Sequence, residues 1–392
     1  MVKKVDFLAD GHRIQKVSPD VRERLSHAQQ NILPREFRSA AELCRRACES
    51  TGVDSRLSEA IKNKDVNAFS RLQRAALVAE LREAAIKVKL PAEAVPQVAD
   101  LVADRVQLLV AFETPDEVVE IVASKVAEVV GDFPKNIESL EQGKNPGDVL
   151  DPFIIAATQE LMHGGDMNGA LQTITAHKAM MMIEGLVGHL HEDVIGRMRG
   201  NVRVPEPRGV DQEALDPVTN PFPGADVVQP PLGIGACLKF HQVKSKTGSA
   251  KGGDGKRLGQ QLKLLSRTYS AEVYYDALIG RSLSGHRSMA GVLKACPSAI
   301  VLVGKSAFSA LTGNPNGAEL LLRVYQSAFR RVAQNAGYNV KIVAAGIAAA
   351  FRRRAEAEGD DYLEVLLRDV TGGSPETQDS RTYLRGSRRR NS

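Results

Sequence analysis

The sequence contains no tryptophan, and aromatic residues make up only 5% of its 392 residues. Surfaces that hold single-stranded nucleic acid by stacking on bases need aromatic side chains, so this class of binder is disfavoured. Only four cysteines are present, which is too few for a disulfide scaffold, and no two of them form a Cys-x-x-Cys pair. Cys44 and Cys48 have no histidine nearby, which favours buried packing over metal binding.

Long apolar runs are also missing. The longest, Ile342 to Phe351, is about half as long as a membrane-spanning helix requires. The first residues, Met1 to Asp6, are not followed by the apolar core of a secretion signal. We therefore expect a cytoplasmic protein without a membrane partner.

The two halves of the chain differ in the sign of their net charge. Residues 1–200 hold 25 Lys and Arg against 30 Asp and Glu, a balance of −5, whereas residues 201–392 hold 27 against 17, a balance of +10. A basic half beside an acidic half indicates that one part of the chain meets a polyanion. A solubilising surface with extra charge in the C-terminal tail is the alternative.

Apolar residues at spacings of three and four predict a helical N-terminal region over residues 1–145. Clear examples follow Leu57, Phe69 and the helix start at Thr114-Pro115. A linker is predicted at 141–148.

A second helical stretch is predicted over 152–200, and it leads into the second half of the chain. Its methionines at 180–182 are interpreted as core residues. His189 and His191 are interpreted as structural, because residues two apart do not share a helical face.

The pattern changes near residue 201, where prolines break the chain and short strand-like runs follow. Strands are predicted at 235–244, 297–304 and 338–345, with helices at 257–269 and 319–335. The sequence therefore predicts an α/β fold with a central mixed sheet over residues 201–350. Residues 373–392 are polar and rich in arginine, which predicts a disordered basic tail.

The stretch with the most chemical content joins Asp226 to Gln242 and Lys244. Phosphodiester hydrolysis needs a divalent cation held by oxygen ligands, an activated water and positive charge near the reacting phosphate. Asp226, at the start of one strand, supplies a carboxylate. Gln242 and Lys244 lie two apart on the next strand and so share one face of the sheet. Val243 then points into the core, and its backbone carbonyl is a further candidate metal ligand.

The pattern Asp226…Gln242-Val243-Lys244 resembles the PD-(D/E)-x-K signature of the restriction-endonuclease-like superfamily. Over about 200 to 345, with His241-Gln-Val-Lys-Ser-Lys-Thr-Gly-Ser and Leu258-Gly-Gln-Gln-Leu, the chain also resembles ApaLI-like type II restriction endonucleases. The resemblance implies a restriction-endonuclease-like core in a catalytic domain at 146–372. It also implies Mg²⁺ as cofactor, double-stranded DNA as substrate, products with 5′-phosphate ends and a cognate DNA methyltransferase as functional partner.

In this interpretation Asp226 binds Mg²⁺, Gln242 assists it and Lys244 acts on the attacking water. We expect a homodimer, because two-fold symmetry lets one site per subunit cut each strand of a palindromic sequence. The chain departs from the signature at Gln242, which is neutral where an acidic residue is expected. Another carboxylate is therefore needed, and Glu184 and Glu192 on the preceding helix are the candidates.

Eleven Lys and Arg against three acidic residues lie between Lys239 and Lys294, which favours contact with DNA. A solvated loop and helix face is the alternative. The predicted DNA-binding residues are Lys246, Ser249, Lys251, Lys256, Arg257, Gln260, Gln261, Lys263, Arg281 and Arg287.

A nucleotide-binding loop at 248–257 is excluded, because Arg257 stands where the magnesium-binding Ser or Thr belongs. Two functions other than restriction remain open. One is a duplex-DNA-binding module of the same fold that has lost cleavage, and the other is a repair or structure-specific nuclease.

Overall fold

The computed structural model describes residues 14–33, 35–141, 151–205, 207, 214–232, 236–246, 254–280, 287–336, 340–358, 363 and 367. The chain forms two compact units. The first consists of Met1–Val122 and Gly188–Ala328, and the second of Ala123–Val187 and Phe329–Ser392. The predicted linker, apart from residue 141, and the basic tail lie outside the described residues.

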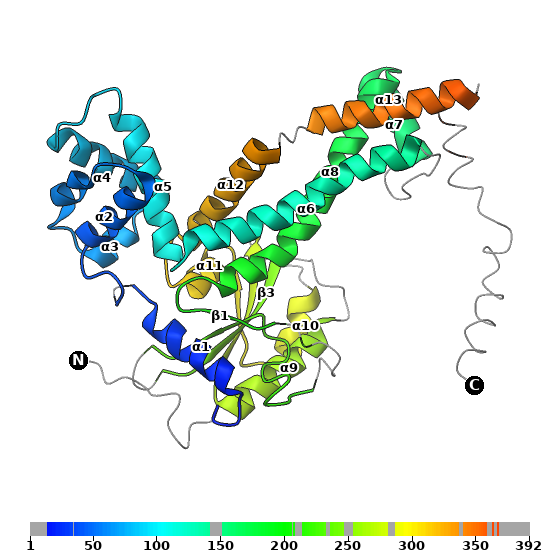
Figure 1. Ribbon diagram of the computed structural model, residues 1–392. Coiled ribbons are helices and arrows are strands. Elements are labelled where there is room, and N and C mark those ends of the chain that lie inside the picture. Colours follow the sequence, from blue (N-terminus) through cyan, green and yellow to red (C-terminus); the bar gives the residue numbers. More distant parts are fainter. Residues whose placement is uncertain are drawn as a thin grey trace. The chain divides into compact units, whose positions relative to one another are not determined.

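The first unit contains a five-stranded mixed sheet, which confirms the predicted α/β class (Figure 1). The strand order is β1-β2-β3-β4-β5, with antiparallel pairing from β1 to β3 and parallel pairing from β3 to β5. The strands are β1 (Val202–Arg203), β2 (Val227–Gln229), β3 (Lys239–Lys246), β4 (Glu272–Ile279) and β5 (Ile300–Val303).

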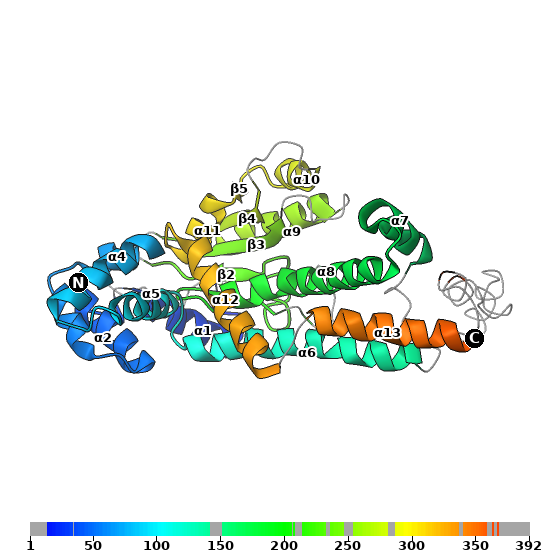
Figure 2. The same ribbon diagram turned by 90° about the horizontal axis from the view of Figure 1, so that it is seen from above.

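Helices α9 (Asp254–Tyr269) and α10 (Arg287–Ala295) cover one face of this sheet together with α1 (Pro19–Gln30). Figure 2 shows α9 alongside β3 and β4. Apolar side chains of α9 at spacings of three and four meet alternate residues of the strands, among them Phe240 and Val273. Helix α11 (Lys305–Thr312) contacts β4 and β5. The core of the first unit therefore lies directly beneath β3.

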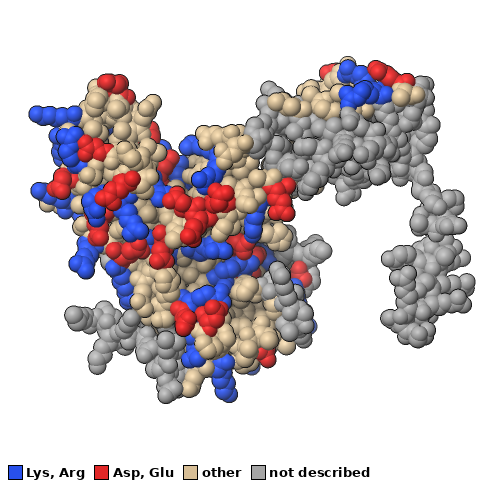
Figure 3. Space-filling model, in the orientation of Figure 1, with Lys and Arg blue, Asp and Glu red and all other residues tan. Residues whose placement is uncertain are grey.

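The N-terminal part of the first unit is helical, as predicted. Its elements are α2 (Ala40–Thr51), the 3₁₀ helix η1 (Ser55–Ile61), α3 (Val66–Ser70), α4 (Arg74–Lys87) and α5 (Val95–Ala111). Cys44 and Cys48 are buried there, which confirms their packing role. On the face drawn in Figure 3, Lys and Arg are interspersed with Asp and Glu over these helices, so that face has no single sign of charge.

Three long helices, α6 (Pro115–Glu141), α8 (Met167–Gly196) and α12 (Gly317–Ala336), begin in one unit and end in the other. The predicted helix start at Thr114-Pro115 is confirmed by α6. The second unit also holds α7 (Pro152–His163) and α13 (Val340–Glu358). Among the described residues, no helix has the length and apolar character needed to cross a membrane.

Two sequence predictions are wrong in the second unit. Of the strand predicted at 338–345, the described residues 340–345 form the start of α13, because the run from Val340 to Val343 continues into the alanine-rich stretch at 344–350, which strongly favours helix. Met180 and Met181 are 67% and 50% exposed, so they are surface residues rather than core residues.

Close contact between α9 and α10 depends on glycine. A Cβ atom on Gly259 would lie 2.7 Å from the Val292 carbonyl oxygen and 2.8 Å from the Ala295 Cβ. A Cβ on Gly255 would lie 2.1 Å from the Ser288 carbonyl oxygen. The two helices can approach this closely only because both positions lack a side chain.

We predict that Gly259→Ala lowers the free energy of unfolding by roughly 1–3 kcal/mol, because the added methyl group forces α10 away from α9. Gly185→Ala is the matched control, since nothing lies within 4 Å of a Cβ at that position of α8. There the same change should stabilise by roughly 0.5–1 kcal/mol through helix propensity. Denaturant unfolding of both variants measures this. Equal effects would contradict the proposed packing constraint.

Candidate functional site

Asp226 immediately precedes β2 and lies opposite Gln242 of β3, in line with the pairing of Val227 and His241. Its backbone N–H donates to the His241 carbonyl over 2.8 Å. Its side-chain Oδ2 accepts hydrogen bonds from Gln242 Nε2 at 2.6 Å and from the Val243 N–H at 2.7 Å. Beyond the Val227–His241 pair, β2 no longer pairs with β3. The Asp226 carboxylate therefore takes the place of a β2 carbonyl as the acceptor for the Val243 N–H.

Val243 is buried in the core, as predicted. Its N–H points toward Asp226, and in an extended strand the N–H and C=O of one residue point to the same side. The Val243 carbonyl therefore also faces the gap between β2 and β3. This arrangement directs the carbonyl toward the pocket side of the sheet, where it can serve as an oxygen ligand.

A cavity of about 150 Å³ brings Asp226, Gln242 and Lys244 together with Glu192, near the C-terminal end of α8. Of the two glutamates considered from the sequence, Glu192 lines this cavity and Glu184 does not. Arg257 and Gln261 of α9 line it as well. Two separate predictions, the reacting residues and part of the DNA-binding set, therefore meet in one pocket.

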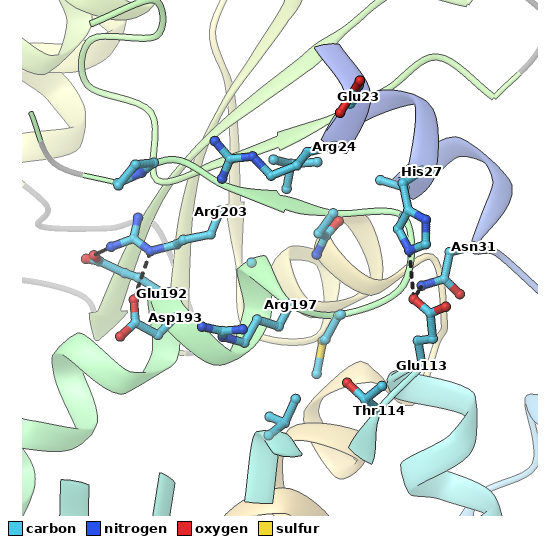
Figure 4. Close-up of a pocket in the computed structure, with 18 of the residues that line it drawn as sticks. Glu23, Arg24, His27, Asn31, Glu113, Thr114, Glu192, Asp193, Arg197 and Arg203 are labelled. Atoms are coloured by element: carbon cyan, nitrogen blue, oxygen red, sulfur yellow. Dashed lines mark hydrogen bonds and ion pairs between the residues drawn. The ribbon is translucent and has the colours of Figure 1, made fainter. Parts of the chain in front are cut away.

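Arg203 of β1 fixes Glu192 beside Asp226. Its guanidinium donates to Glu192 at 2.9 Å and to Asp193 at 3.1 Å. It also donates to the carbonyls of Val204 at 2.7 Å and Asp226 at 2.9 Å. Figure 4 shows Arg203 pointing toward Glu192 and Asp193. This residue was not predicted, since no spacing in the sequence relates Arg203 to the Asp226 motif.

Burial is the main reason that the pKa of Asp226 is raised to about 7. Repulsion by Glu192 raises it further, while Lys244, the Val243 N–H and Arg203 act in the opposite direction. Two carboxylates held in one partly dry pocket disfavour each other's ionisation. The pocket would therefore gain from a cation placed between them.

The oxygen atoms of the pocket suit a hard divalent cation. Mg²⁺ is usually bound by one or two carboxylates together with water, and Glu192 and Asp226 provide two carboxylates. Among the described residues, no group of three or more His, Cys, Asp and Glu side chains forms a metal site. Among the described residues, Gln242 in the pocket and the adjacent Val243 can add an amide and a carbonyl oxygen.

Helix α9 exposes Lys256, Gln260 and Arg267, and Lys263 is half-buried. At 100° per residue, positions 256, 260, 263 and 267 fall on one side of the helix. We call these four residues the α9 stripe. The predicted residues Ser249, Lys251 and Arg281 lie outside the described residues, as do the side chains of Lys246 and Arg287.

The opposite face of β3 holds a buried histidine–aspartate pair. His241 Nδ1 lies 2.8 Å from Asp276 Oδ2 on β4, and both side chains are fully buried. The His241 ring also stacks on Tyr274, with 4.5 Å between ring centres. These contacts hold β3 against β4 directly behind Gln242.

A larger cavity, of about 1190 Å³, adjoins the small pocket and shares Glu192, Pro205 and Pro207 with it. Its walls come from α1, the start of α6 and the end of α8. Here His27 and Asn31 both contact Glu113, at 2.7 and 2.8 Å (Figure 4). Glu192 therefore faces both a confined pocket and a wide opening.

No protein-family model matches the sequence, and no curated protein is significantly similar to it. The function therefore has to be inferred from the site itself.

We predict that Asp226→Asn stabilises the metal-free protein at neutral pH while preserving the two hydrogen bonds to the side-chain oxygen. Because the pKa is higher in the folded state, the folded protein retains a proton that the unfolded chain releases. That stabilisation is complete below about pH 4 and is lost as the pH rises through about 7. The variant should match the wild type near the lower pH and exceed it by roughly 2–4 kcal/mol above the higher one.

Thermal or denaturant unfolding in EDTA across this pH range measures the difference. Asp216→Asn is the control, because backbone N–H groups of Thr219 and Val218 lower the pKa of that exposed carboxyl. It should give no gain at neutral pH. A gain of equal size at both positions would contradict the burial argument.

Proposed function

We propose that this chain is a Mg²⁺-dependent endonuclease that cuts both strands of duplex DNA at a short, specific site. Its core and site would then be those of a type II restriction endonuclease with a PD-(D/E)-x-K signature. The supporting observation is that Asp226, Gln242 and Lys244 share one pocket with a second carboxylate, Glu192, where β2 and β3 separate. In a restriction system, a DNA methyltransferase of the same specificity would be the functional partner.

Each residue of the pocket would have a separate role in the hydrolysis. Asp226 and Glu192 would hold Mg²⁺, and Gln242 orients Asp226 through the 2.6 Å hydrogen bond. When bound, the cation supplies positive charge to the scissile phosphate and lowers the pKa of a coordinated water. Lys244, as an ammonium, would orient the attacking water by hydrogen bonding and would offset negative charge as the bond to phosphorus forms.

The α9 stripe would contact the DNA backbone. Lys256 is exposed and Lys263 is half-buried almost two helical turns away on the same side of the helix, a spacing that lets both reach phosphates of one duplex. Arg257 and Gln261 point into the pocket from the same helix. DNA held along the stripe would thus present a phosphate to Asp226 and Lys244.

A second candidate is a duplex-DNA-binding module of the same fold without cleavage. It is favoured by one observation, the neutral Gln242, whose amide nitrogen donates to Asp226. A repair or structure-specific nuclease would use the same residues on a different DNA substrate. A DNA digest and a gel shift distinguish both alternatives from the endonuclease.

We predict that the wild type cuts long DNA into discrete fragments with Mg²⁺ and not with EDTA. Lys244→Met should reduce the cleavage rate roughly 100- to 10,000-fold, because the attacking water loses its positioning group. Glu192→Gln should require more Mg²⁺ for half-maximal cleavage, and Glu184→Gln should not. Quantitative digests over a Mg²⁺ titration measure all three.

Lys239→Met is the matched control, since Lys239 begins the same strand, is partly exposed and lies outside the pocket. It should cleave as the wild type does. Nicking that follows DNA structure rather than sequence would favour the repair nuclease. Intact DNA that is nevertheless bound in gel shifts would favour the binding module and reject the endonuclease.

We predict that Lys256→Ala combined with Lys263→Ala weakens duplex binding and flattens its salt dependence. Each lost phosphate contact should reduce the slope of log affinity against log salt by about 0.9. The control pair, Lys62→Ala with Lys87→Ala, removes the same charge from exposed positions of the N-terminal helices. Fluorescence anisotropy in Ca²⁺ or EDTA gives both slopes. Equal losses for the two pairs would mean that only net charge matters.

A further inference from the structure

A second cavity of the first unit lies on the opposite face of the sheet from the candidate site. Its volume is about 270 Å³, close to the lower end of the range of roughly 300–1,000 Å³ in which proteins bind small molecules. Gln229 of β2 and Lys239 of β3, which are paired and therefore point to the same face, both line it. Lys239 also lies over the ring of Tyr274, on the face that holds His241. Further walls come from α3, the end of α5, the turn after α8 and the end of α11.

The charge of this cavity differs from that of the larger cavity beside the candidate site. Among the described residues that line it, three are basic, namely Arg71, Arg199 and Lys239, and none is Asp or Glu. The larger cavity has four acidic residues in the described part of its wall. Basic residues without acidic ones favour an anion, because the field inside a concave surface concentrates ions of the opposite sign.

One of the three basic side chains is available for a ligand. Arg199 binds Glu36 and two backbone carbonyls, and Lys239 lies 4.0 Å from Glu272. The exposed guanidinium of Arg71 has neither a hydrogen-bond nor an ion-pair partner within the described part of the chain. An arginine side chain can donate two parallel hydrogen bonds to a carboxylate or a phosphate group. Arg71 is therefore the residue that can bind the charged group of a ligand.

Asn67 adds a second donor next to Arg71. The two residues are four apart, with Asn67 inside α3 and Arg71 directly after it, so their side chains are neighbours on one side of that helical turn. Asn67 is exposed and lines the cavity, and its side-chain amide can donate to an anion. The two side chains can therefore bind one acid group together.

The inner wall of the cavity is apolar. Val110, Met198 and Leu320 line it and are buried, whereas Arg71 and Asn67 are exposed. The cavity thus has its hydrogen-bond donors on the solvent side and apolar side chains in its interior. A ligand with an acid group at one end and an apolar body at the other matches this arrangement.

We propose that this cavity binds a small organic anion, in which a carboxylate or a phosphate monoester is attached to a compact apolar body such as a single ring. The acid group would accept hydrogen bonds from Arg71 and Asn67, and the ring would contact Val110, Met198 and Leu320. The site contains none of the residues assigned to DNA cleavage. The proposal therefore goes beyond the proposed function and does not depend on it.

Calorimetric titration of the full chain with benzoate, phenyl phosphate and benzyl alcohol tests the proposal. At least one of the two anions should bind with a Kd on the order of 0.1–1 mM, which ligands of this size can reach. Benzyl alcohol has the ring without the charge and should bind at least roughly 10-fold more weakly. Tighter binding of phenyl phosphate would support a phosphate monoester as the ligand group, and tighter binding of benzoate would support a carboxylate.

Two variants at exposed positions locate the binding without disturbing the core. Arg71→Gln should weaken anion binding at least roughly 10-fold and leave the alcohol unaffected. Asn67→Asp keeps the shape of the side chain but places a carboxylate beside Arg71, so it should abolish anion binding. Arg38→Gln is the control, because Arg38 is also exposed and lies outside the cavity. It should bind as the wild type does, and an unchanged Tm checks that each variant is folded.

Three results would overturn the proposal. The first is that neither anion binds to the wild type, and the second is that the alcohol binds as tightly as the anions. The third is that Arg71→Gln and Arg38→Gln lose the same affinity, which would mean that only the net charge of the chain matters.

Discussion

The candidate site depends on the guanidinium of Arg203, which joins three segments that the chain would otherwise leave apart. It donates to the carboxylates of Glu192 and Asp193 near the end of α8. It also donates to the carbonyls of Val204, which follows β1, and Asp226, which precedes β2. Three carboxylates lie near this cation, and their mutual repulsion would otherwise push α8 away from β2. Lysine could not replace it, because only the planar fork donates in several fixed directions at once. Arg203 therefore determines that Glu192, rather than another glutamate of α8, lies next to Asp226.

Successive side chains of β3 point to opposite faces of the sheet and therefore lie in two different environments. Gln242 faces the pocket, whereas His241 beside it faces the opposite side and is fully buried against Asp276. Burial raises the pKa of Asp276, and the adjacent His241 opposes that shift. A buried pair of this kind tolerates little displacement. It joins β3 to β4 at the position next to Gln242, whose side chain binds Asp226.

The part of the site that could be predicted is the part set by strand geometry. Gln242, Val243 and Lys244 had to alternate between the two faces, and the observed strand confirms this for Val243. Strand β4 was missed, because Asp276 within it is unfavourable for a strand until His241 pairs with it from β3. The choice between Glu184 and Glu192, and the role of Arg203, depend on where α8 ends against the sheet. No local pattern encodes that contact.

Charge explains why a nuclease built on this site would need a cation. The positive charge of the α9 stripe would favour a phosphate backbone, yet the pocket beside it contains Glu192 and Asp226, which would repel any phosphate that enters. Lys244 and Arg257 offset part of this repulsion. However, Lys244 already interacts with Asp226, and Arg257 pairs with Asp254. A divalent cation between the two carboxylates would reverse the sign of the field at the point where the phosphate must lie. The same burial that raises the pKa of Asp226 would strengthen this effect, because a field inside a partly dry pocket is weakly screened.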